Sequence, residues 1–188
     1  MTSFILASSS PRRLALLQQI GLTPSRVIAT DIDETPGADE LPRALALRLA
    51  REKAVAAATP EEIVLAADTV VGCGRRILPK AESEADAGYC LDLLSARAHV
   101  VVTGVAVAHR GAVRACAVQT RVRFKRLTAA ERQSYIDSGE WRGKAGGYGI
   151  QGRAERFVLS INGSYSAIVG LPLYETAGLL LHAGIAAP

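Results

Sequence analysis

Several features that define whole protein classes are scarce in this sequence. Its three cysteines lie far apart and form no CxxC pair, so neither a disulfide framework nor a zinc site is supported. No apolar run reaches about 18 residues and no signal-peptide pattern opens the chain, which predicts a cytoplasmic protein with no membrane partner. Aromatics are few and no run of lysine and arginine occurs. A nucleic-acid partner is therefore not expected, although the net charge is +4.

The sequence does contain an alternation of strand-like and helix-like segments. Its length of 188 residues predicts a single domain over 1–188 with a substantial core. Two long strand patterns joined at Arg110-Gly111 interrupt the alternation, which favours a mixed, twisted α/β sheet with flanking helices and a second lobe. A ligand cleft is expected between the lobes. Strands are expected near 3–7, 25–30, 63–67, 99–109, 113–124 and 157–161, and helices near 11–20, 42–58, 84–95, 128–138 and 172–182.

The segment from Ala7 to Arg13 joins the first predicted strand to the first predicted helix. Ser10 stands at the N-cap position and Pro11 at the first helical position. Arg12 and Arg13 lie near the positive end of the helix dipole, which costs about 0.3–1 kcal/mol each unless an anion joins them. Hydroxyls, free N–H groups and two guanidinium groups favour a phosphate site here. The alternative is an ordinary turn with solvated arginines.

Asp68 follows the apolar run Ile63–Ala67, and this places it near the end of a buried strand. Ligands of open α/β sheets gather at such strand ends, so Asp68 is a candidate general base or metal ligand. One carboxylate of the acidic loop, Asp31, Asp33 or Glu34, is a candidate second ligand for a divalent ion. The alternatives are a turn or helix-capping aspartate and a solvated acidic loop.

Lys53 and Lys80 are candidate partners for a polyphosphate, because with Arg12 and Arg13 they supply the charge that a triphosphate requires. Either lysine alone is typical of a solvated side chain. The glycine-rich run 139–152 lets the backbone approach a ligand closely, and its Gln151 offers an amide of the kind that reads a base edge. It matches neither a Walker A loop nor a dinucleotide fingerprint, so a flexible loop is the alternative.

Five motifs, in order along nearly the whole chain, resemble the Maf family of nucleotide pyrophosphatases. They are Ser8-Ser9-Ser10-Pro11-Arg12-Arg13, Ala67-Asp68-Thr69-Val70-Val71, Leu94-Ser95 with Thr103-Gly104, Lys144-Ala145-Gly146-Gly147-Tyr148-Gly149-Ile150-Gln151-Gly152, and Val169-Gly170-Leu171-Pro172-Leu173. The resemblance implies an elongated α/β fold with a deep cleft, similar to inosine triphosphate pyrophosphatases. It also implies hydrolysis of a nucleoside triphosphate to the monophosphate and pyrophosphate with Mg²⁺ or Mn²⁺, and a homodimer.

The resemblance also implies a role for each matching residue. Asp68 matches the catalytic base, and Glu34 the acidic residue near the metal. The positions linked to phosphate binding or substrate positioning are Ser10, Arg12, Arg13, Lys53 and Lys80. The positions linked to substrate choice are Arg12, Thr69 and Gln151.

The Asp68-Thr69 pair and the Gly149-Ile150-Gln151-Gly152 form resemble the branch that acts on dTTP and UTP. One departure is Pro79-Lys80-Ala81, where the family commonly has Gly-Lys-Pro. A non-catalytic nucleotide-binding regulator of cell division or septum formation is the alternative function.

Overall fold

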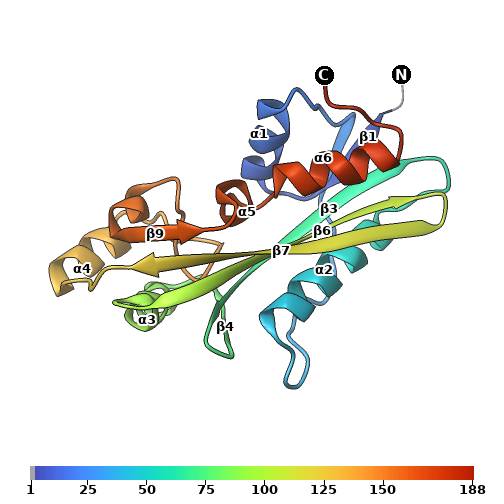
Figure 1. Ribbon diagram of the computed structural model, residues 1–188. Helices are drawn as coiled ribbons and strands as arrows, with labels where there is room; N and C mark the ends of the chain where they lie inside the picture. Colours follow the sequence, from blue (N-terminus) through green and yellow to red (C-terminus); the bar gives the residue numbers. More distant parts are fainter. Residues whose placement is uncertain (1–2) are drawn as a thin grey trace.

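The computed structural model describes residues 3–188, which form a mixed sheet flanked by helices (Figure 1). The main sheet has seven strands, ordered β2-β1-β3-β6-β7-β9 with β4 paired to the end of β3. Their bounds are β1 (Phe4–Ala7), β2 (Arg26–Ile28), β3 (Ile63–Cys73), β4 (Arg76–Leu78), β6 (Ala98–His109), β7 (Ala112–Phe124) and β9 (Val158–Asn162). A separate pair joins β5 (Lys80–Ala81) to β8 (Lys144–Ala145). The helices are α1 (Pro11–Gln19), α2 (Pro42–Ala56), α3 (Glu84–Leu94), α4 (Ala129–Asp137), α5 (Tyr165–Val169) and α6 (Leu173–His182), with a 3₁₀ helix at Arg153–Phe157.

The sheet is mixed, as predicted. Strand β1 is parallel to both β2 and β3, whereas β6, β7 and β9 follow as antiparallel neighbours. The predicted hairpin joins β6 to β7 through Arg110 and Gly111, whose φ angles of 50° and 75° are those that a tight two-residue turn requires. Within residues 3–188, no helix combines the length and the apolar character needed to cross a membrane.

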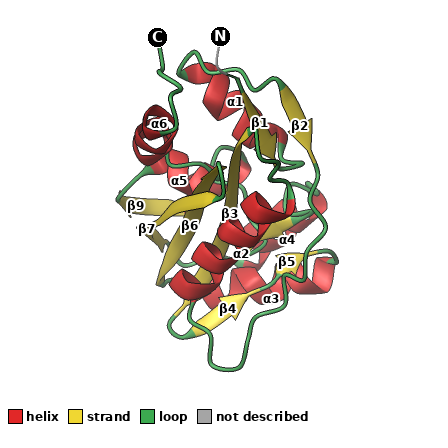
Figure 2. Cartoon of the chain, turned by 90° about the vertical axis from the view of Figure 1, so that its right-hand side faces the viewer, coloured by secondary structure: helices red, strands yellow, loops and turns green. Residues whose placement is uncertain are grey.

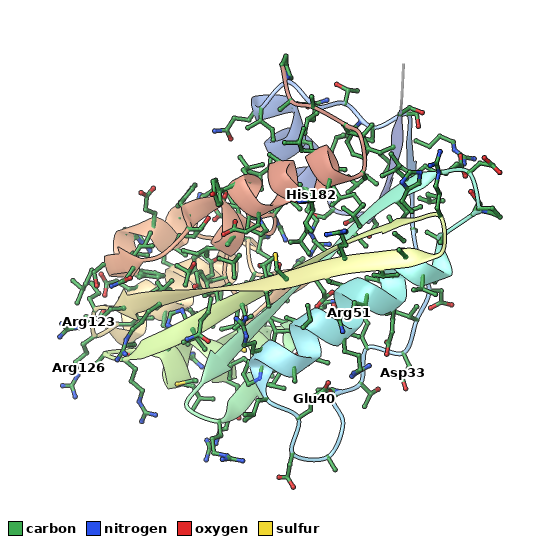
Figure 3. The ribbon with its side chains drawn as sticks, turned by 45° about the vertical axis from the view of Figure 1, so that its right-hand side comes forward. Asp33, Glu40, Arg51, Arg123, Arg126 and His182 are labelled. Carbon is green, nitrogen blue, oxygen red and sulfur yellow. The ribbon has the colours of Figure 1, made fainter. Side chains whose placement is uncertain are left out.

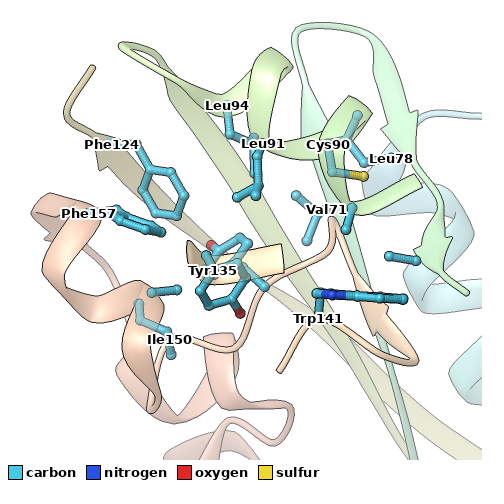
Figure 4. Close-up of a cluster of buried hydrophobic side chains, with 14 of the residues drawn as sticks. Val71, Leu78, Cys90, Leu91, Leu94, Phe124, Tyr135, Trp141, Ile150 and Phe157 are labelled. Atoms are coloured by element: carbon cyan, nitrogen blue, oxygen red, sulfur yellow. The ribbon is translucent and has the colours of Figure 1, made fainter. Parts of the chain in front are cut away.

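Side-chain alternation along the inner strands divides the core between the two sheet faces. On one face Leu6 and Leu65 pack with helices α1 and α6, and on the other Ala66 and Ala106 pack against α2 (Figure 2). At the far end of the long strands a third cluster holds the large aromatic side chains Tyr135, Trp141 and Phe157 between α3, α4 and the glycine-rich segment (Figure 4). Each such side chain contributes about 1.5–3 kcal/mol when fully buried.

Strand β3 is longer than the sequence predicts, and this corrects the expected position of Asp68. The strand continues through Thr69-Val70-Val71 to Cys73, so Asp68 lies inside it rather than at its end. The run of β-branched residues after Asp68 explains the extension. On one side, β1 pairs only as far as Ala66 and β4 begins only at Val71, which leaves residues 67–70 without a strand neighbour. Asp68 therefore faces an open edge in the middle of the sheet.

Helix α2 packs against the strand backbone at Gly104, the residue of β6 that pairs with Asp68. A Cβ atom at Gly104 would lie 2.1 Å from the carbonyl oxygen of Ala46, which is backbone and cannot rotate away. Only glycine allows this approach. Because α2 carries Lys53, the same contact sets how far the lysine reaches toward β3.

We expect Gly104→Ala to lower the free energy of unfolding by about 2–4 kcal/mol, because α2 must move off the sheet. Urea denaturation measures this value. Gly178→Ala is the matched control, since Gly178 lies in α6 with open space around it and alanine there favours the helix by about 0.5–1 kcal/mol. Equal unfolding free energies for Gly104→Ala and the parent protein would contradict the packing argument.

Candidate active site

A cavity of about 330 Å³ lies at the open edge of β3. It is bounded by the loop and helix start that follow β1, by α2, by β3, by the glycine-rich segment and by the C-terminal end of α5. All nine residues to which the family resemblance assigns a role line it: Ser10, Arg12, Arg13, Glu34, Lys53, Asp68, Thr69, Lys80 and Gln151. Segments far apart along the chain therefore contribute to one site.

Two lysines and two carboxylates form a connected cluster on one wall. The Nζ atom of Lys53 lies 2.5 Å from Oδ1 of Asp68 and 2.6 Å from Oε1 of Glu34, and Lys80 pairs with the other oxygen of Glu34. Lys53 and Asp68 are 7% and 4% exposed, so each charge depends on the other for compensation. Burial raises the pKa of Glu34, but the hydrogen bonds and charges of the two lysines together outweigh it and leave that pKa lowered.

Arg13 is fixed by three neutral acceptors. Its Nε donates to the carbonyl of Gly170 at 2.8 Å, Nη1 to the hydroxyl of Ser8 at 2.9 Å, and Nη2 to the hydroxyl of Thr69 at 3.4 Å. Burial lowers the pKa of Arg13 and of Arg12, while the negative charge of Asp68 opposes the effect at Arg13. Both guanidinium groups stay protonated. Their positive charge thus lies in a partly desolvated place, where an anion would be favoured.

The start of α1 confirms one part of the predicted cap and corrects another. Ser10 occupies the N-cap position and Pro11 the first helical position, but the Ser10 side chain makes no capping hydrogen bond. The N–H of Ser10 instead donates to the Ser8 hydroxyl at 3.2 Å. No acidic residue lies in the first turn, so its N–H groups and the two arginines have no carboxylate of their own helix.

The glycine-rich segment forms the facing wall. Gly146 has a φ of 66°, and a Cβ atom there would lie 2.8 Å from the Val71 side chain, so the segment can fold against β3 only as glycine. The segment also brings Lys144 into the cavity, although no role for this residue is predicted from the sequence. Burial lowers the pKa of Lys144, and the nearby charge of Arg12 lowers it further. The one sequence feature that could indicate a role for Lys144 is its position within the glycine-rich run.

Of the three acidic candidates in the loop before α2, Glu34 alone lines the cavity. Asp33 is exposed, and one of its oxygens accepts a hydrogen bond from the N–H of Thr35 at 2.9 Å. Figure 3 shows Asp33 and Glu40 on the part of the chain that leads into α2. The loop therefore contributes one carboxylate to the site.

The described residues contain no group of three His, Cys, Asp or Glu side chains arranged to hold a metal ion. Glu34 and Asp68 nevertheless place one oxygen each within 2.6 Å of a single point, the Nζ atom of Lys53. One or two carboxylates are what Mg²⁺ uses when substrate phosphates and water complete its shell. The donor set fits a hard divalent cation that arrives with a polyphosphate.

Comparison with known proteins places the chain in a family. A family model described as Maf-like protein matches residues 3–183. The chain belongs to the Maf-like family. Among the relatives, the dTTP/UTP pyrophosphatase of Caulobacter vibrioides is 62% identical over 181 residues, covering 95% of this chain and 94% of the relative. That of Hyphomonas neptunium is 62% identical over 177 residues, covering 94% and 93%.

Among solved structures, a HAM1 protein from Coxiella burnetii aligns with a TM-score of 0.46 and 20% identity, over 68% of this Maf-like chain and 75% of that chain.

The lowered pKa of Glu34 predicts a pH dependence of stability. Its ion pairs stabilise the folded state above the unfolded-state pKa of 4.5, and this contribution is lost as the pH falls through the lower folded-state value. Glu34→Gln should therefore be less stable than the parent at pH 7, by no more than about 1 kcal/mol because the site is partly solvated. The difference should shrink as the pH falls below 4.5.

Urea denaturation between pH 7 and pH 3 measures both proteins. Glu61→Gln is the control, because Glu61 is exposed and makes no ion pair with the described residues. A Glu34→Gln difference that stays constant over this range would refute the assignment.

Proposed function

We propose that this protein hydrolyses dTTP and UTP to the nucleoside monophosphate and pyrophosphate. The observation that carries the proposal is the position of buried Asp68 in the same cavity as the arginine-bearing start of α1. The names of the Caulobacter and Hyphomonas relatives, at 62% identity over almost the whole chain, support the same reaction and substrates.

Asp68 is the proposed general base. The Nζ atom of Lys53 donates to the Oδ1 atom of Asp68 at 2.5 Å, which leaves Oδ2 to accept a proton from a water molecule. The oxygen of that water attacks the α–β anhydride, a new P–O bond forms, and the bridging P–O bond breaks to release pyrophosphate. Little covalent help is needed, because phosphoryl transfer depends mainly on positioning and charge.

The cations divide the remaining tasks. Arg12, Arg13, Lys80 and the first turn of α1, together with the Ser10 hydroxyl, bind the polyphosphate and stabilise the negative charge that grows on the leaving group. Lys53 orients Asp68 and adds its own charge. Arg12, Thr69 and Gln151 are the proposed residues of base selection, and Gln151 is exposed at the cavity wall, where its amide can meet a base edge.

A divalent cation, Mg²⁺ or Mn²⁺, is the proposed cofactor, and Glu34 and Asp68 are its proposed protein ligands. When bound, it neutralises phosphate charge and polarises the anhydride. The convergence of the two carboxylates on Lys53 supports this assignment. A single domain with two lobes around the cavity, a homodimer and a cytoplasmic location stay predictions from the sequence.

A non-catalytic nucleotide-binding regulator is the alternative function, and turnover separates it from the enzyme. A panel of nucleoside triphosphates with pyrophosphate detection should give the highest rates with dTTP and UTP. Binding of dTTP without release of monophosphate would favour the regulator.

Asp68→Asn keeps the shape of the side chain but removes the base, so pyrophosphate release from dTTP should fall by about 10²–10⁴-fold. Asp92→Asn is the matched control and should leave the rate unchanged, because Asp92 of α3 pairs with Arg132 of α4, outside the cavity. A near-parental rate for Asp68→Asn would show that another group is the base.

Removal of divalent metal with EDTA should abolish pyrophosphate release, and Mg²⁺ should restore it. Glu34→Gln should raise the Mg²⁺ concentration that gives the half-maximal rate by about tenfold, since one of two carboxylate ligands is lost. Full activity in EDTA would show that the reaction does not require a divalent metal. An unchanged Mg²⁺ requirement in Glu34→Gln would show that Glu34 is not a ligand of the metal ion.

A further inference from the structure

Thr103 is a fully buried polar residue next to the cavity, and neither the sequence motifs nor the proposed mechanism gives it a role. It lies on β6 directly opposite Thr69 of β3, so the two side chains share a face of the sheet. Their hydroxyl oxygens are 2.9 Å apart, and the Thr103 hydroxyl lies 2.7 Å from the carbonyl oxygen of Ala167 in α5.

The direction of every hydrogen bond in this group follows from counting protons. A carbonyl only accepts, so Thr103 uses its single proton on Ala167. The bond between the two threonines must then be donated by Thr69. Because the Thr69 proton is committed there, its oxygen presents only lone pairs on its other side, where the Nη2 atom of Arg13 donates to it at 3.4 Å.

We propose that Thr103 is a positioning residue for substrate binding, which acts by keeping the Thr69 hydroxyl an acceptor for Arg13. All three hydrogen bonds are donated in the same direction. Arg13 donates to Thr69, Thr69 donates to Thr103, and Thr103 donates to the carbonyl of Ala167. Without the Thr103 oxygen, the Thr69 proton is free to turn toward Arg13, where a donor would face a donor. The guanidinium then loses one of its three fixed acceptors.

Helix α5, which accepts the hydrogen bond from Thr103, also contacts Arg13. Ala167 lies in α5 and Gly170 caps it, so one element accepts both from Thr103 and from Nε of Arg13. A Cβ atom at Gly170 would lie 3.5 Å from that Nε atom. Thr103 therefore links the strand that carries Thr69 to the helix that holds the guanidinium plane.

The test compares Thr103→Val, which removes the hydroxyl at nearly constant shape, with Thr103→Ser, which keeps it. This kinetic test rests on the proposed function. Thr103→Val should lower kcat/KM for dTTP by about tenfold, mainly through KM, because a hydrogen bond to a charged group is lost. Thr103→Ser should stay within about threefold of the parent. If Thr103→Val does not fold, Thr103→Ala removes the same hydroxyl.

Thr120→Val is the matched control. Thr120 is also fully buried, and its hydroxyl donates to the carbonyl of Ser164, the residue that precedes α5, but its hydrogen bonds reach neither Thr69 nor Arg13. It should lose stability without loss of kcat/KM. An equal kinetic loss in Thr120→Val, or a loss in Thr103→Ser as large as in Thr103→Val, would overturn the proposal.

Two further measurements do not require turnover. Calorimetry with a non-hydrolysable α,β-imido analogue of dTTP should show about tenfold weaker binding for Thr103→Val, but less than twofold further weakening when Arg13→Ala is already present. NMR of the free protein should show hindered rotation of the Arg13 guanidinium in the parent and in Thr120→Val, and averaged signals in Thr103→Val. Additive binding losses or unchanged Arg13 signals would refute the link. A parent protein that binds the analogue but releases no pyrophosphate would refute the proposed function alone.

Discussion

The ion pair between Lys53 and Asp68 is the interaction on which the rest of the site depends. Neither charge is stable alone at 4–7% exposure, so the pair forms only if helix and strand approach closely. The missing side chain at Gly104 permits that approach, because the helix backbone occupies the space where a Cβ would stand. A packing detail on β6 thereby determines where the central carboxylate of the cavity is held.

Two consecutive residues of β3 then send their side chains to opposite faces of the sheet. Asp68 meets Lys53 on the α2 face, whereas Thr69 meets Arg13 and Thr103 on the face toward α5. Such alternation normally separates neighbours, because the sheet stands between them. Here residues 67–70 have no strand on one side, and both side chains reach the same cavity around the open edge.

Most turn and helix-start signals in the sequence are confirmed. The turn at Arg110-Gly111 is present, and capping boxes at Ser83 and Thr128 begin the two helices expected near 84–95 and 128–138. These depend on residues within three positions of one another. Helix α5 was missed because five residues give too little periodicity to detect.

The length of β3 was underestimated for a different reason. In the sequence, Asp68 directly follows an apolar run, which suggests that the strand ends there. The strand continues beyond Asp68 because residues 64–72 pair with β6. The sequence also suggested the residue types of the site but not their pairing. Nothing near Lys53 in the sequence indicates that it bridges Glu34 and Asp68.

The departure at Pro79-Lys80-Ala81 is compatible with the pairing of β5 with β8. The carbonyl of Pro79 accepts from the N–H of Gly146, and that of Ala81 accepts from the N–H of Gly143. Carbonyls are the groups that both proline and alanine retain, so neither position depends on its side chain for this pairing. Lys80 lines the cavity and pairs with Glu34.

The positively charged side chains of the cavity fall into two groups, which differ in whether a carboxylate pairs with them. Its lysines at 53 and 80 are compensated by carboxylates, whereas Arg13 bonds only to uncharged oxygen atoms and Lys144 donates to the carbonyl of Glu140. A neutral acceptor orients a cation without cancelling its charge, so the arginine wall keeps a full positive potential for a polyanion. The two lysines instead form ion pairs with the carboxylates of Glu34 and Asp68. A polyphosphate and a carboxylate that accepts a proton are both negatively charged, so they would repel each other if they bound the same cations. Because different cations contact each of them, both can occupy a cavity of about 330 Å³.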